Sequence, residues 1–435
     1  MTSPPEYCRF WAERTNLAVA NRPMRAHPMA PIDAQFYWMS QAIPNDQFLL
    51  YAFAGEPEDL DVAVAEVLAR SRVSTDLTVR LADAGRWRYP HWVPSPEPAD
   101  VLRHPERTWA DCLDAIVRIT EDQLDLQTAA WRLHVFAPVR RLPGYDGVGT
   151  VVVMQIAHAL ADGGRASALA GWLFGRAAPV APLVATHPGW AALPWRAAVA
   201  ARAHHVMVAD TRAGTVPPPA TSRPPLATNT RPAGTRAVRT LVRQRAQLRG
   251  PTVTVAVLSA VSEELSEYLD ESCDELGAEV PLAKSGARLA NNHFGNITVG
   301  LYPGLPSHAR QDRIHAELAA ARRRAAHPAV AAGDRAVAAM PAAVLAWGVG
   351  KFDPDIRPAQ VAGNTVVSSV NRGAGDLHFG AAPVLLTAGF PALSPAMGLT
   401  HGVHGIADTV VISVHAAESA IADIGSYVQM LDTAL

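Results

Sequence analysis

The chain has 435 residues, of which 49% are apolar and 18% are charged. This length exceeds one ordinary hydrophobic core, so we expect two domains, and the composition is that of a soluble globular protein and excludes a disordered chain. With 38 basic and 40 acidic residues the net charge is −2. Such a balance argues against a protein that recruits nucleic acid through its overall field.

Cysteine usage and the N-terminus bear on the compartment. Cys8, Cys112 and Cys273 are odd in number and widely spaced, which favours a reducing compartment without a disulfide framework. The N-terminus lacks a basic segment followed by an apolar core, and no apolar stretch reaches the roughly 18–20 residues of a membrane span. We therefore expect a cytoplasmic protein, with peripheral attachment to the inner membrane or to lipid bodies as an open alternative.

The first half of the chain alternates helical and strand patterns. Apolar residues recur at helical spacing in residues 58–70 and 108–124. Residues 131–139 begin by alternating apolar and polar side chains, which is typical of a strand. Residues 150–156 are rich in β-branched side chains and predict a central strand buried on both faces. A further helix is predicted at residues 165–174, so a short turn joins a buried strand to a helix.

The middle of the chain differs in composition. Ten prolines fall between residues 176 and 235 and predict an extended linker or crossover, with a short helix at residues 195–210. The second half is expected to begin near Arg236. Its predicted helices are residues 252–269, 308–325 and 419–431, and its predicted strands are residues 296–302, 365–369, 384–387 and 409–414. Both halves therefore mix strands and helices in a similar way.

The turn after the buried strand carries His158, followed by Asp162 and Gly163. An imidazole accepts protons near neutral pH, and acyl transfer to a hydroxyl or amine needs such a base. Asp162 suits a structural role, in which it pairs with an arginine or caps the next helix. Gly163 and Gly164 allow a tight turn and leave space beside the imidazole. A short pattern of this kind is, by itself, more often an ordinary loop.

Residues 155–163, Gln-Ile-Ala-His-Ala-Leu-Ala-Asp-Gly, resemble the active-site motif of the CoA-dependent acyltransferase superfamily. Within that superfamily they are most similar to the bacterial wax ester synthase / diacylglycerol acyltransferase family. Other segments resemble this family in the same order along most of the chain: residues 31–37 with Pro31, Asp33 and Phe36, Gly295-Asn296, Leu305-Pro306, residues 367–370 and Ser394-Pro395. Several short motifs in the right order are more specific than any one of them.

The resemblance implies an α/β fold of two chloramphenicol-acetyltransferase-like domains with a tunnel between them. Residues 1–175 would form the first domain, residues 176–235 the linker or crossover, and residues 236–435 the second domain. The catalytic His158 would lie in the tunnel. Acyl-CoA, or an acyl-carrier thioester, would enter as donor and co-substrate, and a hydroxylated small molecule or lipid would be the acceptor. No bound cofactor is implied, and the activity would belong to lipid metabolism.

The same resemblance assigns roles to individual residues. His158 would deprotonate the acceptor hydroxyl, and Asp162, with Gly163, would hold the loop. The tetrahedral oxyanion needs hydrogen-bond donors; Asn296 is a candidate, and a structural role for it fits equally well. Asn292 could line the acceptor channel, although an ordinary turn is the simpler interpretation.

The sequence also departs from the family. The first histidine of the family's pair is Ala157 here, and an asparagine–aspartate pair appears as Thr254-Val255. The family's Pro-Gly-Pro appears as Asn371-Arg372-Gly373. Three functions therefore stay open: an O-acyltransferase, a condensation-like enzyme with an amine or carrier-bound acceptor, and a non-catalytic lipid- or partner-binding protein.

Other polar clusters have simpler interpretations. His401, His404 and His415 have no cysteine or carboxylate cluster that would complete a zinc site, so we predict solvent or loop histidines and no metal site. The run Arg322-Arg323-Arg324 predicts a solvated helix face. Binding of the CoA phosphates is the alternative for these arginines.

Overall fold

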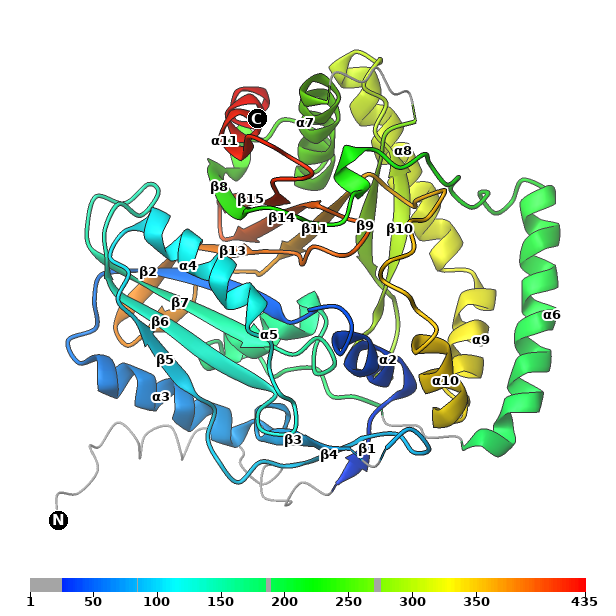
Figure 1. Ribbon diagram of the computed structural model, residues 1–435, viewed down its shortest axis with the longest axis horizontal. Coiled ribbons are helices and arrows are strands. Elements are labelled where there is room, and N and C mark those ends of the chain that lie inside the picture. The colour runs from blue at the N-terminus through cyan, green and yellow to red at the C-terminus, as the bar shows by residue number, and fades with distance from the viewer. Residues whose placement is uncertain (1–25, 84, 185–188, 270–274) are drawn as a thin grey trace.

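The computed structural model describes residues 26–83, 85–184, 189–269 and 275–435. These residues form two lobes, each built on a six-stranded sheet, and a small three-stranded sheet below the first lobe in Figure 1. The small sheet consists of β1 His27–Pro28, β3 Val79–Ala82 and β4 His91–Pro94. The structure therefore has the two-lobed α/β architecture that the sequence predicts.

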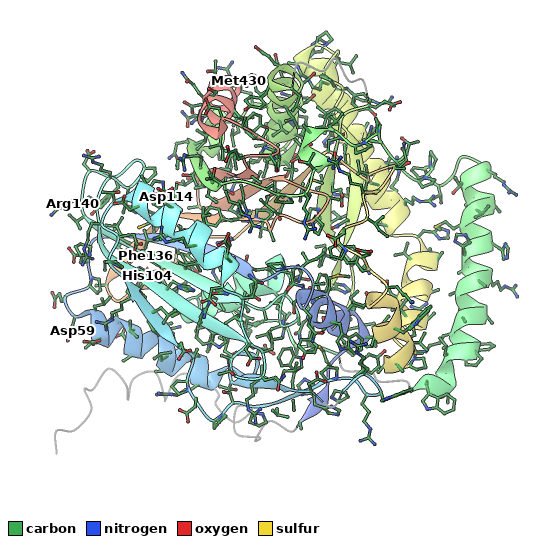
Figure 2. All side chains as sticks on the ribbon, in the orientation of Figure 1. Asp59, His104, Asp114, Phe136, Arg140 and Met430 are labelled. Carbon is green, nitrogen blue, oxygen red and sulfur yellow. The ribbon has the colours of Figure 1, made fainter. Side chains whose placement is uncertain are left out.

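The first lobe has the strand order β12-β13-β2-β7-β6-β5. The strands are β2 Gln47–Ala54, β5 Val101–His104, β6 Trp131–Val139, β7 Gly149–Ile156, β12 His378–Phe379 and β13 Ala382–Gly389, and the helices of this half are α2 Pro31–Ser40, α3 Leu60–Val73, α4 Trp109–Glu121 and α5 Gly163–Leu173. β7 is buried along its whole length, as its β-branched run predicts. On β5 and β6, which follow β7 in the sheet, His104 stacks on Phe136 with ring centroids 4.5 Å apart (Figure 2).

Two strands of the first lobe come from the far end of the chain. β13 pairs antiparallel with β2, with Gly389 opposite Leu49. Phe379 of β12 is fully buried and packs against Phe53, with ring centroids 5.8 Å apart. The predicted boundaries at residues 175 and 235 stay a prediction, but the first lobe's sheet also takes in residues 378–389.

The second lobe has the strand order β10-β9-β11-β14-β15-β8. The strands are β8 Arg236–Gln244, β9 Gly277–Ala283, β10 Phe294–Gly300, β11 Thr365–Asn371, β14 Leu399–Ile406 and β15 Thr409–Ala417, and the helices packed with them are α7 Val253–Tyr268, α8 Ser307–Ala325 and α11 Ile424–Ala434. Helix α4 of the first lobe contacts β8, so the two lobes also meet away from the central turn.

Three further helices lie beside the second lobe: α6 Leu193–Arg212, α9 Pro328–Val337 and α10 Ala342–Val349. α6 packs along α9 at the right of Figure 1, and α10 contacts α2. Short 3₁₀ turns occur at Thr75–Leu77, Trp190–Ala192, Ala227–Asn229 and Arg245–Gln247. Among the described residues no single helix is long and apolar enough to span a membrane, whereas α9 and α10 together meet that test across a bend of 103°.

Most predicted elements are confirmed, with shifts at their ends. The strand at residues 131–139 is β6, and α6 is longer than the predicted short helix, at 20 residues. The closing helix begins at Ile424 and not at residue 419, because the Asp423 carboxylate accepts from Ser426 N and caps the first turn. The sequence patterns do not predict β2, β8, β9 and β14. Short apolar runs such as β2 fit a buried helix as well as a strand.

The prediction for the C-terminal histidines is wrong. His401, His404 and His415 are buried in β14 and β15. His401 bonds Thr365 Oγ1 and Tyr427 Oη, both at 2.9 Å, so its polar atoms are satisfied inside the core. The described residues contain no cluster of histidine, cysteine and carboxylate groups that could hold a metal ion. The buried thiol of Cys112 is free, and the other two cysteines lie outside the described residues.

We predict that Phe379→Ala lowers the free energy of unfolding by about 3–5 kcal/mol, because it leaves a cavity in a fully buried site of the first lobe. Phe352→Ala is the matched control, since the Phe352 side chain is 43% exposed. Urea denaturation of both variants measures the difference. Equal, small losses in the two variants would show that β12 does not complete this core.

Candidate active site

The turn after β7 is fixed at both ends by backbone and side-chain bonds. Ala157 N donates to Ala130 O at 3.0 Å, which continues the strand register to the residue before His158. Asp162 is the N-cap of α5, and its Oδ1 accepts from Arg165 N at 2.8 Å. Strand and cap together determine the path of residues 158–162.

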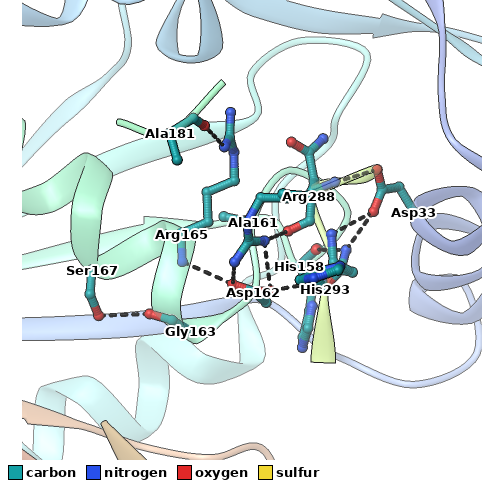
Figure 3. A network of polar contacts seen from close by, with 12 residues as sticks. Asp33, His158, Ala161, Asp162, Gly163, Arg165, Ser167, Ala181, Arg288 and His293 are labelled. Carbon is teal, nitrogen blue, oxygen red and sulfur yellow. Dashed lines mark hydrogen bonds and ion pairs between the residues drawn. The ribbon is translucent and has the colours of Figure 1, made fainter. Parts of the chain in front are cut away.

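Asp162 also forms an ion pair with the second lobe. Arg288 lies in the loop between β9 and β10, and its guanidinium donates to both Asp162 oxygens at 2.8 and 3.2 Å (Figure 3). His293 N adds a third donor at 2.8 Å. Burial opposes the charged carboxylate, but the Arg288 guanidinium and the backbone donors outweigh it and hold the pKa of Asp162 below its usual value. Both structural roles expected for Asp162 are therefore present together.

A second carboxylate of the first lobe, Asp33 on α2, meets the same loop. Asn291 N donates to Oδ2 at 2.9 Å, and Asn292 donates to Oδ1 through its backbone N at 2.8 Å and its side-chain Nδ2 at 2.9 Å. Burial raises the pKa of Asp33 to about 7 against these bonds. Residues 288–293, called the docking segment below, thus lie on two buried carboxylates of the opposite lobe (Figure 3).

The imidazole of His158 contacts two aromatic rings at this junction, and the two rings also contact each other, with centroids 5.9 Å apart. Phe36 of α2 stacks on it in parallel, with centroids 4.1 Å apart and planes at 5°. Phe294, at the start of β10, lies on it at 5.7 Å and 30°. Burial lowers the pKa of His158, so the ring is neutral at pH 7. The His158 side chain keeps partial exposure, while its Nδ1 is buried.

Four of the five predicted site residues come together here, and one does not. His158, Asp162, Gly163 and Asn292 share the junction, and Asn292 Nδ2 donates to His158 O at 2.8 Å. Asn296 is exposed on β10, and its side chain partly offsets the burial that raises the pKa of Glu279. The oxyanion role for Asn296 stays a prediction.

Gly163 is predicted from the sequence to lie in a tight turn that needs glycine, but the structure does not show such a need. Its φ lies outside the left-handed region, and a Cβ there would meet Val370 Cγ2 at 3.5 Å, an ordinary contact. The turn therefore does not require glycine at this position. A catalytic role for Gly163 stays a prediction without this support.

Sequence reasoning misses part of the site. Asp33 and Phe36 enter it only through the resemblance of residues 31–37, and Phe294 and Arg288 do not enter at all. Their contacts to residues 158–162 span more than a hundred residues of sequence, and no local periodicity marks such pairs. One pattern in the sequence could have identified Phe36: it follows Asp33 by about one helical turn and therefore lies on the same side of α2.

The fold matches known structures, although no protein-family profile and no curated protein sequence matches the chain. Wax ester synthase/diacylglycerol acyltransferase from Marinobacter aquaeolei VT8 is similar at 18% identity and a TM-score of 0.59, over 94% of this chain and 98% of that one. The first condensation domain of the calcium-dependent antibiotic synthetase, with a substrate analogue, is similar at 14% identity and a TM-score of 0.60, over 95% of each chain.

A starter condensation domain of rhizomide synthetase, solved as a variant with C8-CoA, is similar at 13% identity and a TM-score of 0.55, over 94% of this chain and 95% of that one. At these identities the likeness defines the fold. The chain has the two-lobed α/β fold of the wax ester synthase and condensation-domain structures.

The raised pKa of Asp33 predicts a pH-dependent stability. In the unfolded chain the carboxyl ionises near pH 3.8, and in the folded chain near pH 7. The contribution of Asp33 to stability is therefore full below pH 3.8 and is lost as pH rises through 7, by up to about 4 kcal/mol. Urea denaturation between pH 4.5 and 8 should show this slope, and Asp33→Asn should remove most of it. The pKa of Asp46 is also raised, to about 6, and leaves a smaller slope of the same sign. An unchanged slope in Asp33→Asn would contradict the assignment.

Proposed function

We propose that the protein transfers an acyl group from a thioester, either acyl-CoA or carrier-bound, to the hydroxyl of an alcohol acceptor. The observation that carries this proposal is the placement of His158: a partly exposed imidazole at the junction of the lobes, in contact with Phe36 and Phe294. Burial lowers its pKa, which favours the neutral form. A neutral imidazole can accept the proton that a hydroxyl must lose to become a nucleophile. The rhizomide synthetase domain with C8-CoA supports acyl-CoA as the donor.

This base would account for both proton transfers of the reaction. As the acceptor oxygen attacks the thioester carbonyl carbon, His158 Nε2 would take the hydroxyl proton, and a tetrahedral oxyanion would form. The oxyanion would collapse by breaking the carbon–sulfur bond, and the imidazolium would return its proton to the leaving thiolate. The products are an ester and a free thiol, and His158 is regenerated.

An apolar surface next to the site supports a lipid-like substrate. An open groove of about 660 Å³ lies between α2 and α10 and is lined by Met39, Val344 and Trp347. Helix α2 contributes Met39 to this groove and Phe36 to the His158 contact. A groove of this size and lining fits an alkyl chain, and it also supports peripheral contact with a lipid surface.

A condensation-like reaction is the second candidate, because the same base would deprotonate an amine and condensation domains share the fold. One of them was solved with C8-CoA and Leu-SNAC. The two candidates differ only in acceptor. The assay below therefore includes alcohols and amines as separate panels.

We expect His158→Ala to lower thiol release from acyl-CoA by about 10²–10⁴-fold, because the base is removed. The assay measures free thiol with acyl-CoA chains of several lengths and panels of alcohols and amines. His315→Ala, which changes an exposed histidine on α8, is the matched control and should keep full activity. If no donor and acceptor pair gives thiol release that depends on His158, both candidates are contradicted.

The pH profile provides an independent test. Since burial lowers the pKa of His158, the neutral base is already dominant at pH 6.5. We expect kcat/KM to rise with pH below that value and to be level at pH 7–8. A rise that continues well above pH 8, beyond the ionisation of Asp33 near pH 7, would indicate a different base.

A further inference from the structure

The Asn292 side chain has a fixed orientation between the two lobes. Its Nδ2 group donates one hydrogen to Asp33 Oδ1 at 2.9 Å and the other to His158 O at 2.8 Å. His158 O is a carbonyl, and Asp33 Oδ1 also accepts from Asn292 N at 2.8 Å, so both oxygens act as acceptors. The amide nitrogen must therefore face them, and Asn292 Oδ1 points away as a free acceptor.

The free acceptor and the imidazole complement each other. Asn292 Oδ1 and His158 Nδ1 are both buried, and neither reaches full hydrogen-bond geometry with any group in the described part of the chain. Burial lowers the pKa of His158, whereas its own carbonyl and the Asn292 amide act in the opposite direction. A buried amide oxygen can only accept, so it favours a proton on Nδ1. The lone pair then lies on Nε2, where a general base needs it.

Aromatic contacts fix the plane of the same ring. Phe36 follows Asp33 by three residues on α2, and Phe294 follows Asn292 by two residues. Each lobe therefore contributes one aromatic ring, and the polar chain from Asp33 through Asn292 to His158 crosses from the first lobe to the second and back. Aromatic contacts alone do not discriminate between the two tautomers of a neutral imidazole; the acceptors that act on the ring, its own carbonyl and the Asn292 amide, do so.

We propose that Asp33 is a positioning residue for His158: through Asn292 it fixes the imidazole in the tautomer that leaves Nε2 free to accept a proton. This inference rests on the proposed function for its catalytic consequence. Its structural content, the tautomer of His158, can be measured without any substrate.

The carboxylate is suited to this role because of the number of donors it accepts. Three N–H groups of Asn291 and Asn292 point at its two oxygens, and the charged group that acts on it besides these donors is Arg165. An asparagine in its place has one oxygen and one NH₂ group, so at least one donor would face another donor. The clash with that donor would displace the Asn291–Asn292 backbone from α2 and so disturb the position of the Asn292 amide.

The test measures the His158 tautomer by ¹⁵N NMR of histidine-labelled protein at pH 8, with the His158 signals identified by their absence in His158→Ala. We expect the Nδ1–H form in the wild type and a measurable share of the Nε2–H form in Asp33→Asn. We also expect kcat to fall by about 10–100-fold with KM within about twofold, since misorientation affects the reacting geometry. Asn292→Ala, which keeps Asp33, should give the same two changes.

Asp46→Asn is the matched control. Asp46 is also buried, and its carboxylate accepts from Leu124 N and Gln155 Nε2, both at 2.7 Å, away from the docking segment. This variant should lose stability but keep the wild-type tautomer and kcat. A comparable tautomer change in Asp46→Asn would overturn the proposal, because general loosening would then explain it.

The remaining outcomes separate this inference from the proposed function. A folded Asp33→Asn or Asn292→Ala protein with an unchanged His158 tautomer overturns the inference, whatever its activity. If Asp33→Asn does not fold, Asn292→Ala decides the question alone. A tautomer change in a protein whose wild type releases no thiol supports the positioning role and refutes only acyl transfer.

Discussion

The docking segment, residues 288–293, is the contact on which the candidate site depends. It brings donors from the second lobe to Asp33 and Asp162, two buried carboxylates of the first. A buried carboxylate without partners costs several kcal/mol, so neither aspartate is compatible with separated but dry lobes. The contacts that hold the two lobes together are therefore the same contacts that set the geometry around His158.

The two carboxylates receive different partners, and their pKa values move in opposite directions. Asp162 faces the guanidinium of Arg288, and its pKa is lowered. Asp33 faces neutral amides, which do not offset its burial, and its pKa is raised to about 7. The difference follows from charge: a formal cation compensates desolvation, whereas N–H dipoles do so only in part. One carboxylate thus acts as an ion-pair anchor, and the other acts as a hydrogen-bond acceptor for an oriented amide.

Two positions that differ from the wax ester synthase pattern have partners in this structure. Thr254, where the pattern has asparagine, bonds Ser369 Oγ at 2.8 Å. Arg372, where the pattern has glycine, is buried with its guanidinium 5.1 Å from the Tyr51 ring centroid. Both polar side chains therefore have contacts of the kind that a folded protein requires.

The sequence by itself determined the local elements and the position of the turn. The β-branched run of β7, the cap at Asp162 and the apolar spacing of α7 are local signals, because they depend on neighbours within a few residues. Order of motifs also predicted the two-lobed fold. Only the tertiary structure decided that Asp33, Phe36 and Arg288 meet the turn, that His401 is buried, and that β13 joins the first lobe. Such contacts depend on which surfaces exclude water together, and a pattern along one chain does not encode that pairing locally.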